Sequence, residues 1–68
     1  MELAEKMKQY RKACRMTQKE FAKAGGITRE AVAAIEAGYN KNPTMETLMG
    51  IAKAMDVTID KLVYNGKE

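Results

Sequence analysis

Residues 17–38 constrain the fold more than any other part of the chain. Two short stretches within them have apolar residues at helical spacing, and each is preceded by a threonine that can cap a helix, Thr17 or Thr28. Gly25-Gly26 interrupts the pattern between the two stretches, and Gly38 ends the second. Glycine suits both places because the backbone after a helix often needs a positive φ. This segment therefore predicts two helices joined by a tight turn.

Helical spacing continues on both sides of this segment, and no run of residues alternates with the period of a β-strand. One helix is predicted over residues 2–14, a fourth after the cap Thr44, and a short fifth after Thr58. The positions predicted to face the core are Leu3, Met7, Tyr10, Cys14, Phe21, Ala22, Ala24, Ile27, Val32, Ile35, Met45, Leu48, Met49, Ile51, Ala52 and Met55, and those predicted to lie either inward or at an interface are Ile59, Leu62 and Val63. The expectation is one all-α domain over residues 1–68 with five helices, whose second and third form a helix-turn-helix at about residues 17–38.

Composition and charge limit the classes of function that this chain can have. The chain has 68 residues, a net charge of +3, no histidine and a single cysteine, so it offers no internal disulfide and no zinc site. Residues 1–41 hold 9 Lys/Arg against 5 Asp/Glu, a net +4, and the remaining residues hold 3 against 4, a net −1. The positive charge is therefore concentrated in the part that holds the helix-turn-helix, as expected of a face that meets phosphates.

Several function classes lack support. No apolar run is long enough to span a membrane, and the first residues are acidic and lack the apolar stretch of a signal peptide. These two features favour a cytoplasmic protein without membrane contact. No nucleophile with a base, no phosphate-cradling glycine loop and no metal-ligand cluster is present. We therefore expect no enzyme activity, no metal, no cofactor and no small-molecule effector.

A set of spaced residues from about Met7 to Val63 matches a known pattern. The matching residues are Arg11, Thr17-Gln18, Phe21-Ala22, Gly26-Ile27-Thr28, Val32, Ile35-Glu36, Gly38, Pro43, Leu48, Ile51-Ala52, Val57-Thr58 and Leu62. Together they resemble the phage-repressor type of helix-turn-helix domain, the Cro/CI or XRE family, and imply its lambda-repressor-like fold. Arg15 and Asp56 stand where such proteins often carry Gly or Asn, so both are expected in the left-handed region. Ala37 replaces a common Asn.

The third helix would be the recognition helix, whose first residues reach base edges in the DNA major groove. We predict base reading by Thr28, Arg29, Glu30 and Ala34, with Ala33 a weaker candidate. Arg29 is the strongest, because its guanidinium can donate to both O6 and N7 of guanine. Glu30 can accept from cytosine, yet nearby phosphates repel a carboxylate, so solvation at a helix start is an equal alternative.

The resemblance implies phosphate contacts at the start of the second helix and in the loop after the third. The predicted residues are Gln18, Lys19, Tyr39, Asn40, Lys41 and Asn42, with a merely solvated surface or a mobile loop as the alternative. It also implies that Arg11 and Glu36 form an internal ion pair that fixes the recognition helix in place.

These features predict a sequence-specific, double-stranded DNA-binding protein that acts as a homodimer. Its role would be a small transcriptional regulator, a repressor of phage, mobile-element or restriction-modification type. The fifth helix would supply the dimer interface through Ile59, Leu62, Val63 and Tyr64. The alternative is an antitoxin-like module that uses its C-terminal helix to bind another protein.

Overall fold

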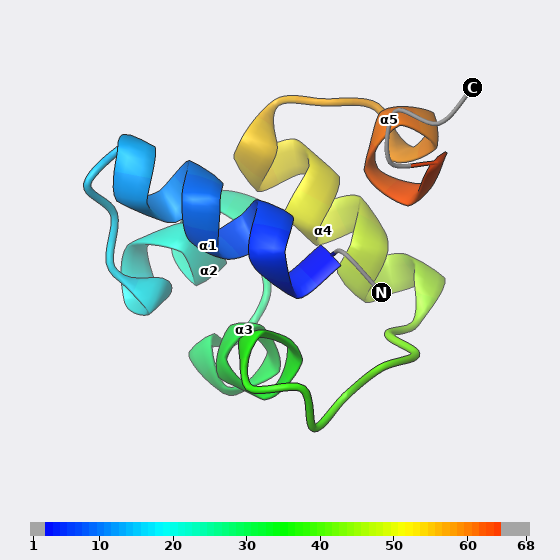
Figure 1. Ribbon diagram of the computed structural model, residues 1–68, viewed down its shortest axis with the longest axis horizontal. Helices are drawn as coiled ribbons and strands as arrows, with labels where there is room; N and C mark the ends of the chain where they lie inside the picture. Colours follow the sequence, from blue (N-terminus) through cyan, green and yellow to red (C-terminus); the bar gives the residue numbers. More distant parts are fainter. Residues whose placement is uncertain (1–2, 65–68) are drawn as a thin grey trace.

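The computed structural model describes residues 3–64, with side chains as far as residue 62. Over this range the chain forms helices and connecting turns, with no strand, and this confirms the all-α prediction. The five helices are α1 (Leu3–Ala13), α2 (Gln18–Gly25), α3 (Arg29–Glu36), α4 (Met45–Met55) and α5 (Ile59–Tyr64). In Figure 1, α1, α2 and α4 overlap at the centre, while α3 lies at the lower edge, seen nearly end on.

Threonine side chains begin four of the five helices, as the sequence predicts. At α2, Thr17 Oγ1 accepts from the backbone N–H of Glu20 at 3.1 Å, and Glu20 Oε1 accepts from the N–H of Thr17 at 2.8 Å, which completes a capping box. The same threonine contact, to the N–H three residues on, starts the other three helices, at Thr28, Thr44 and Thr58. Each cap satisfies a donor that the helix itself leaves unpaired.

The core lies where α1, α3 and α4 meet α2. Its largest fully buried side chains are Phe21, Met7, Ile51 and Val32, one from each of these four helices. Tyr10 packs its ring edge-on against Phe21, with centroids 6.3 Å apart and an interplanar angle of 76°. Because α3 contributes Val32 and Ile35 to this core, its orientation is set by packing on the rest of the domain.

Two glycines bring α2 and α4 closer than side chains would allow. A Cβ atom built on Gly25 would lie 2.3 Å from the carbonyl oxygen of Gly50. A Cβ atom on Gly50 would lie 2.5 Å from Cγ2 of Ile27 and 2.8 Å from the carbonyl oxygen of Gly25. Both glycines are buried. The missing side chains therefore set the distance between α4 and the turn that leads into α3.

Two non-glycine residues adopt left-handed backbone conformations, as predicted. Arg15 has φ 56° in the turn between α1 and α2, and Asp56 has φ 59° directly after α4. The N–H of Asp56 donates to carbonyls at the end of α4, so this residue also ends the helix. Arg and Asp thus replace the more usual glycine at a modest conformational cost.

Four residues predicted to face the core are exposed instead. Cys14 lies in the turn after α1, beyond the last residue of that helix, and Ala24 lies on the outer side of α2. Met45 and Met49 are 59% and 57% exposed, because α4 turns its other side, with Ile51 and Ala52, toward the core. The prediction rested on apolar residues at helical spacing. In α4 this spacing did not distinguish the side that packs on the core from the exposed side next to it.

Candidate nucleic-acid interface

The first turn of α3 is free on the surface of the domain. Thr28, Arg29 and Glu30 are all exposed, because the buried side of the helix is formed by residues later in the sequence, Val32 and Ile35. Ala34, one turn after Glu30 on the same side, is half-buried, and so is Ala33. The residues predicted to read bases therefore share the outer side of one helix, with the long polar side chains at its N-terminal end.

A hydrogen-bonded chain links this first turn to the interior. Glu36 accepts two bonds from Arg11, Nε to Oε2 at 2.9 Å and Nη2 to Oε1 at 2.8 Å. Gln18 Nε2 also donates to Glu36 Oε1, at 3.0 Å, and Gln18 Oε1 accepts from Arg29 Nη1 at 3.5 Å. Since Glu36 accepts only, it turns the amide of Gln18 so that its carbonyl oxygen faces Arg29. Arg29 thus lies at one end of a chain of contacts that starts on α1, joined to it by the longest of these bonds.

Arg11 and Glu36 form the ion pair that the resemblance implied. The side chain of Glu36 is 5% exposed and that of Arg11 is 17% exposed, and Arg11 Nη1 also donates to the carbonyl of Met16 at 3.1 Å. Burial alone would raise the pKa of Glu36, but the hydrogen bonds from Arg11 and Gln18 outweigh it and lower this pKa. The pair joins α1 to the last residue of α3 and so fixes the end of α3 opposite the exposed first turn.

The loop from residue 37 to residue 44 is fastened to α3 at its start. The N–H groups of Tyr39 and Asn40 donate to the carbonyl of Ala34 at 2.9 Å and 3.1 Å, and Asn40 Oδ1 accepts from the N–H of Asn42 at 3.1 Å. Tyr39 is 88% exposed, and Lys41 and Asn42 are also exposed. The predicted phosphate-contacting side chains are therefore accessible, while half-buried Asn40 shapes the loop.

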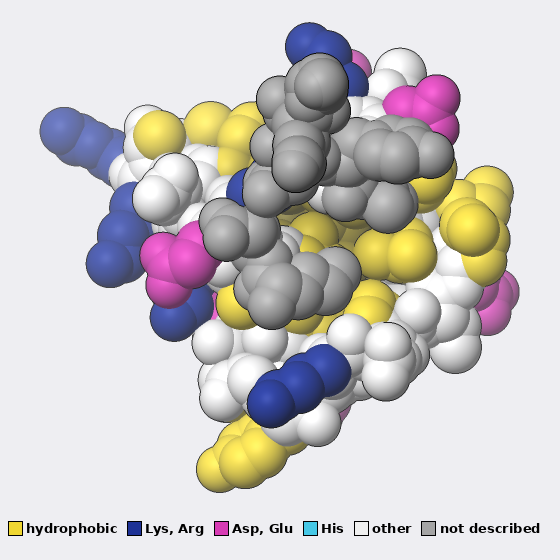
Figure 2. Space-filling model, turned by 45° about the vertical axis from the view of Figure 1, so that its right-hand side comes forward, with side chains coloured by type: hydrophobic (Ala, Val, Ile, Leu, Met, Phe, Trp, Pro, Cys, Tyr) yellow, Lys and Arg dark blue, Asp and Glu magenta, His cyan; other side chains and the backbone are white. Residues whose placement is uncertain are grey.

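Exposed basic side chains lie before and within α2 along the chain. Lys19, in its first turn, is exposed, and so are Lys12, Arg15 and Lys23 nearby along the chain. Figure 2 shows Lys and Arg side chains projecting from the left of the view, with one acidic group among them. Gln18 itself is half-buried and its amide serves the protein, so a contact from it to phosphate stays a prediction.

The residues predicted to form a dimer interface on α5 lie in different environments. Leu62 is 4% exposed and belongs to the core, so its side chain is not available to a partner and its assignment is wrong. Ile59 is half-buried and packs against the same core. The side chains of Val63 and Tyr64 lie outside the described part of the chain. The two apolar side chains of α5 that are described thus pack on the domain, while Asp60 and Lys61 are exposed.

Two features of the structure have no counterpart in the sequence predictions. Lys6 Nζ donates to the carbonyls of Lys61 at 3.2 Å and Leu62 at 2.9 Å, which holds α5 on α1. Gly50 allows the close approach of α2 and α4 described above. A glycine inside an amphipathic helix was the one available signal for the latter, and no local pattern marks a contact between Lys6 and residues so far along the chain.

Neither a metal cluster nor a membrane span is found in the range that the structure describes. No three His, Cys, Asp or Glu residues between positions 3 and 64 gather at a possible metal site. None of the helices in this range combines the length and hydrophobicity needed to cross a bilayer.

Comparison with known proteins gives one family and several relatives. The helix-turn-helix family matches residues 7–62. The chain is 38% identical over 60 residues to an uncharacterized HTH-type transcriptional regulator of Bacillus subtilis, YqaE, covering 88% of this chain and 51% of that protein. It is 38% identical over 68 residues to the HTH-type transcriptional activator BcrR of Enterococcus faecalis, covering 100% and 32%. It is 31% identical over 61 residues to the control protein C.SmaI of Serratia marcescens, covering 90% and 71%.

The chain thus spans about half of YqaE and a third of BcrR. No solved structure matches the chain.

Proposed function

Since the chain belongs to the XRE-type helix-turn-helix family of DNA-binding proteins, we propose that it regulates transcription by sequence-specific binding to double-stranded DNA. The observation that carries this proposal is the free first turn of α3, where Arg29 and Glu30 are exposed beside a threonine cap. A helix presented in this way enters the major groove with its N-terminal residues toward the bases.

The contacts divide into two kinds. Arg29 would read a guanine, with Thr28, Glu30 and Ala34 beside it on the groove floor. Exposed Lys19, Tyr39, Lys41 and Asn42, together with Gln18 and Asn40, would contact the backbone on either side. Phosphate contacts fix the position of the protein on the duplex, and base contacts supply the sequence preference.

We further propose that two copies bind one operator. Dimers of this motif place their recognition helices about 34 Å apart, one turn of DNA, on a near-palindromic site. The domain measures 32 × 23 × 18 Å, so two copies side by side span that separation. Repression is the proposed outcome, through occupation of a promoter by the dimer. Because one relative is named an activator, a reporter assay with and without the protein decides the sign of regulation.

The genetic setting that we propose is a phage, a mobile element or a restriction-modification system. This part rests on the phage-repressor pattern of the motif residues alone. The genes beside this one test it, because such regulators control neighbouring phage, mobility or restriction genes.

Duplex binding measured against salt tests the core of the proposal. Neutralised phosphates release counterions, so the logarithm of affinity should fall steeply and linearly with the logarithm of salt concentration. A flat response, or no duplex binding at low salt, would favour the alternative of a protein-binding module.

Replacing Arg29 by Ala should relax the base preference at one G·C pair of each half-site. A bidentate contact to guanine discriminates against other bases by about 1–3 kcal/mol. The variant should retain the fold, since Arg29 is exposed. Binding to all single-base variants of one half-site by the parent and the variant gives the result, and an equal loss on every sequence would make Arg29 a phosphate contact.

Replacing Lys41 by Ala should weaken binding to specific and non-specific duplexes alike. It should also reduce the slope of the logarithm of affinity against the logarithm of salt concentration by about one unit. Lys41 is exposed and has no ion-pair partner among the described residues. Lys61→Ala on α5 is the matched control, because it removes one exposed lysine away from the proposed interface. A changed base preference in Lys41→Ala would contradict the phosphate assignment.

A further inference from the structure

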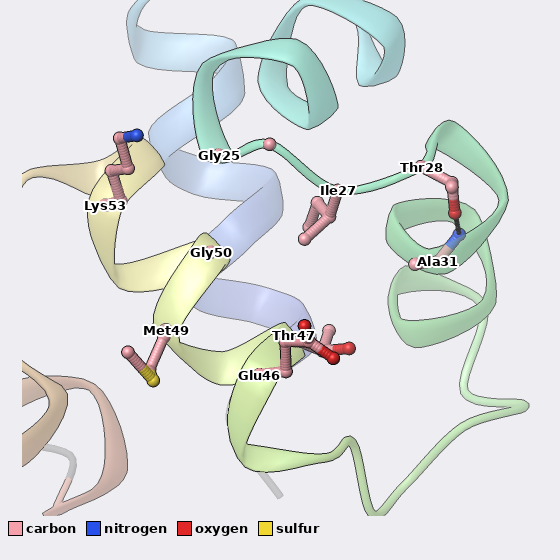
Figure 3. Close-up of a pocket in the computed structure, with 10 residues that line it drawn as sticks. Gly25, Ile27, Thr28, Ala31, Glu46, Thr47, Met49, Gly50 and Lys53 are labelled. Atoms are coloured by element: carbon pink, nitrogen blue, oxygen red, sulfur yellow. Dashed lines mark hydrogen bonds between the residues drawn. The ribbon is translucent and has the colours of Figure 1, made fainter.

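Helical geometry divides α3 into a side that packs on the domain and a side that faces away from it. Val32, Ile35 and Glu36 follow one another at the spacing i, i+3, i+4, so they share one side of the helix, and all three are buried. Ala31 lies on the flank of α3 toward α4, where it lines the groove beside the turn between α2 and α3 (Figure 3). The side opposite the buried residues is therefore the side that the proposed DNA duplex would approach.

This opposite side, named here the outer face of α3, has a polar side chain only in the first turn. Its members recur at the spacing i, i+3, i+4, i+7 and are Glu30, Ala33, Ala34 and Ala37. Glu30 and Ala37 are exposed, and the two alanines between them are half-buried. Arg29, also exposed, precedes Glu30 in the first turn. After that turn the outer face therefore presents methyl groups and no polar side chain.

The backbone groups behind these alanines are already used within the protein. The N–H of Ala37 donates to the carbonyl of Ala33 at 2.9 Å. The carbonyl of Ala34 accepts from the N–H groups of Tyr39 and Asn40 at 2.9 Å and 3.1 Å. The N–H groups inside the helix donate to the carbonyls four residues before them. A base edge that meets this part of α3 would therefore be offered an apolar contact rather than a hydrogen bond.

One feature of a base edge suits an alanine side chain, and it is a methyl group. Thymine carries its C5 methyl in the major groove, and apolar contact with alanine is one of the ways in which proteins distinguish thymine. Cytosine methylated at C5 carries the same group at the same ring position. Alanine is also short, so a helix that presents it can lie close enough to the groove floor for carbon atoms to meet at about 3.5–4.0 Å.

We infer that Ala34 contacts the C5 methyl group of a pyrimidine in the operator, either thymine or 5-methylcytosine. This inference rests on the proposed DNA binding and specifies what the second turn of α3 reads. Ala34 lies about 160° around the helix from buried Glu36, whereas Ala33 lies only about 60° from it, so Ala34 is nearer the centre of the outer face. Ala34 follows Arg29 by about 7.5 Å along the axis, roughly two base pairs of DNA. The methyl group therefore lies about two base pairs from the guanine that Arg29 reads.

Duplexes that differ only by a C5 methyl group test the contact. Selection from random duplex DNA supplies the preferred site, and two pairs of bases are then compared at each position within about three base pairs of the Arg29 contact. Uracil lacks the methyl of thymine and keeps its hydrogen-bonding groups, so the dissociation constant should rise about fourfold at one position, as for one buried methyl-sized group. At the same position cytosine should bind about fourfold more weakly than 5-methylcytosine. A ratio in one pair alone identifies that pair's methylated base as the ligand.

Removing the methyl group of the protein completes the test. Ala34→Gly should lower the ratio of the uracil and thymine dissociation constants to about one, because one partner of the contact is then missing. Both constants are measured on the same variant, so any loss of folded protein cancels in their ratio. Ala24→Gly, which removes an exposed methyl group from α2, is the matched control and should keep the parental ratio. A ratio that survives in Ala34→Gly would overturn the inference, since the methyl effect would then arise elsewhere.

Failure of this inference and failure of the proposed function give different results. Equal affinity for the two bases of each pair at every position, with a G·C preference that Arg29→Ala removes, overturns the methyl contact and leaves sequence-specific binding intact. A protein that shows no base preference on any duplex overturns the proposed function, and the methyl contact with it.

Discussion

Glu36→Ala should lower the free energy of unfolding by about 3 kcal/mol, because removing one member of a buried pair leaves the other charge uncompensated. Arg11 would then lose both of its bonds to the carboxylate, and Gln18 would lose the acceptor of its amide. In a domain of this size, that loss lowers Tm by about 12–24 °C. Thermal melts of the parent and the variant measure it.

The double variant Arg11→Met/Glu36→Leu is the informative control. Replacing both charges by apolar groups of similar size removes the desolvation cost along with the attraction, so it should destabilise less than Glu36→Ala. An unchanged Tm for Glu36→Ala would contradict the burial of the pair.

Acid should weaken the same contact. The pKa of Glu36 is lowered in the folded state, so its contribution to stability is fully present above the unfolded-state value of about 4.3. That contribution is lost as the pH falls through the lower, folded-state pKa. Glu36→Gln should therefore show a smaller loss of stability than the parent between pH 5 and the acid limit, about pH 2, of the unfolding measurements. If the parent and Glu36→Gln lost equal stability on acidification, other carboxylates would be responsible for the acid dependence.

Gly25→Ala and Gly50→Ala should each destabilise the domain by about 2 kcal/mol, since overpacking a close contact forces backbone shifts. Tm would fall by about 8–16 °C. Packing and helix propensity predict opposite signs for the change in stability. By helix propensity alone, alanine within α2 or α4 would stabilise by about 1 kcal/mol, so a gain in Tm would show that the two helices do not meet at these glycines.

Gly26→Asn is the control for a glycine that has free space around the position of a Cβ atom. Gly26 has φ 70° and no atom near the position of a Cβ, and asparagine tolerates the left-handed region better than other side chains. This variant should lose less than half as much stability as Gly25→Ala. Chemical denaturation of the three variants, analysed with one common m-value, gives the free energies of unfolding to be compared.

Local chemistry explains which predictions hold. The threonine caps depend on residues within a few positions, so the sequence specifies them, whereas the left-handed Arg15 and Asp56 were expected from the family resemblance. The Arg11–Glu36 pair joins residues far apart, and only a family resemblance pointed to it. The exposure of Met45 and Met49 depends on how α4 rotates over α2, which apolar spacing leaves open. The Gly25–Gly50 contact and the hold of Lys6 on α5 depend on tertiary geometry alone.

The contact between Gln18 and Arg29 has a consequence for the entropy of binding. A long arginine side chain that is free in solution loses rotamer freedom when it docks on a base, and this loss opposes binding by about 0.5–1.5 kcal/mol. Arg29 already rests against the carbonyl oxygen of Gln18, and Gln18 is itself held by a side chain of the core. We therefore expect part of the ordering that the proposed base contact requires to be complete before DNA arrives, with the folding energy of the domain supplying it.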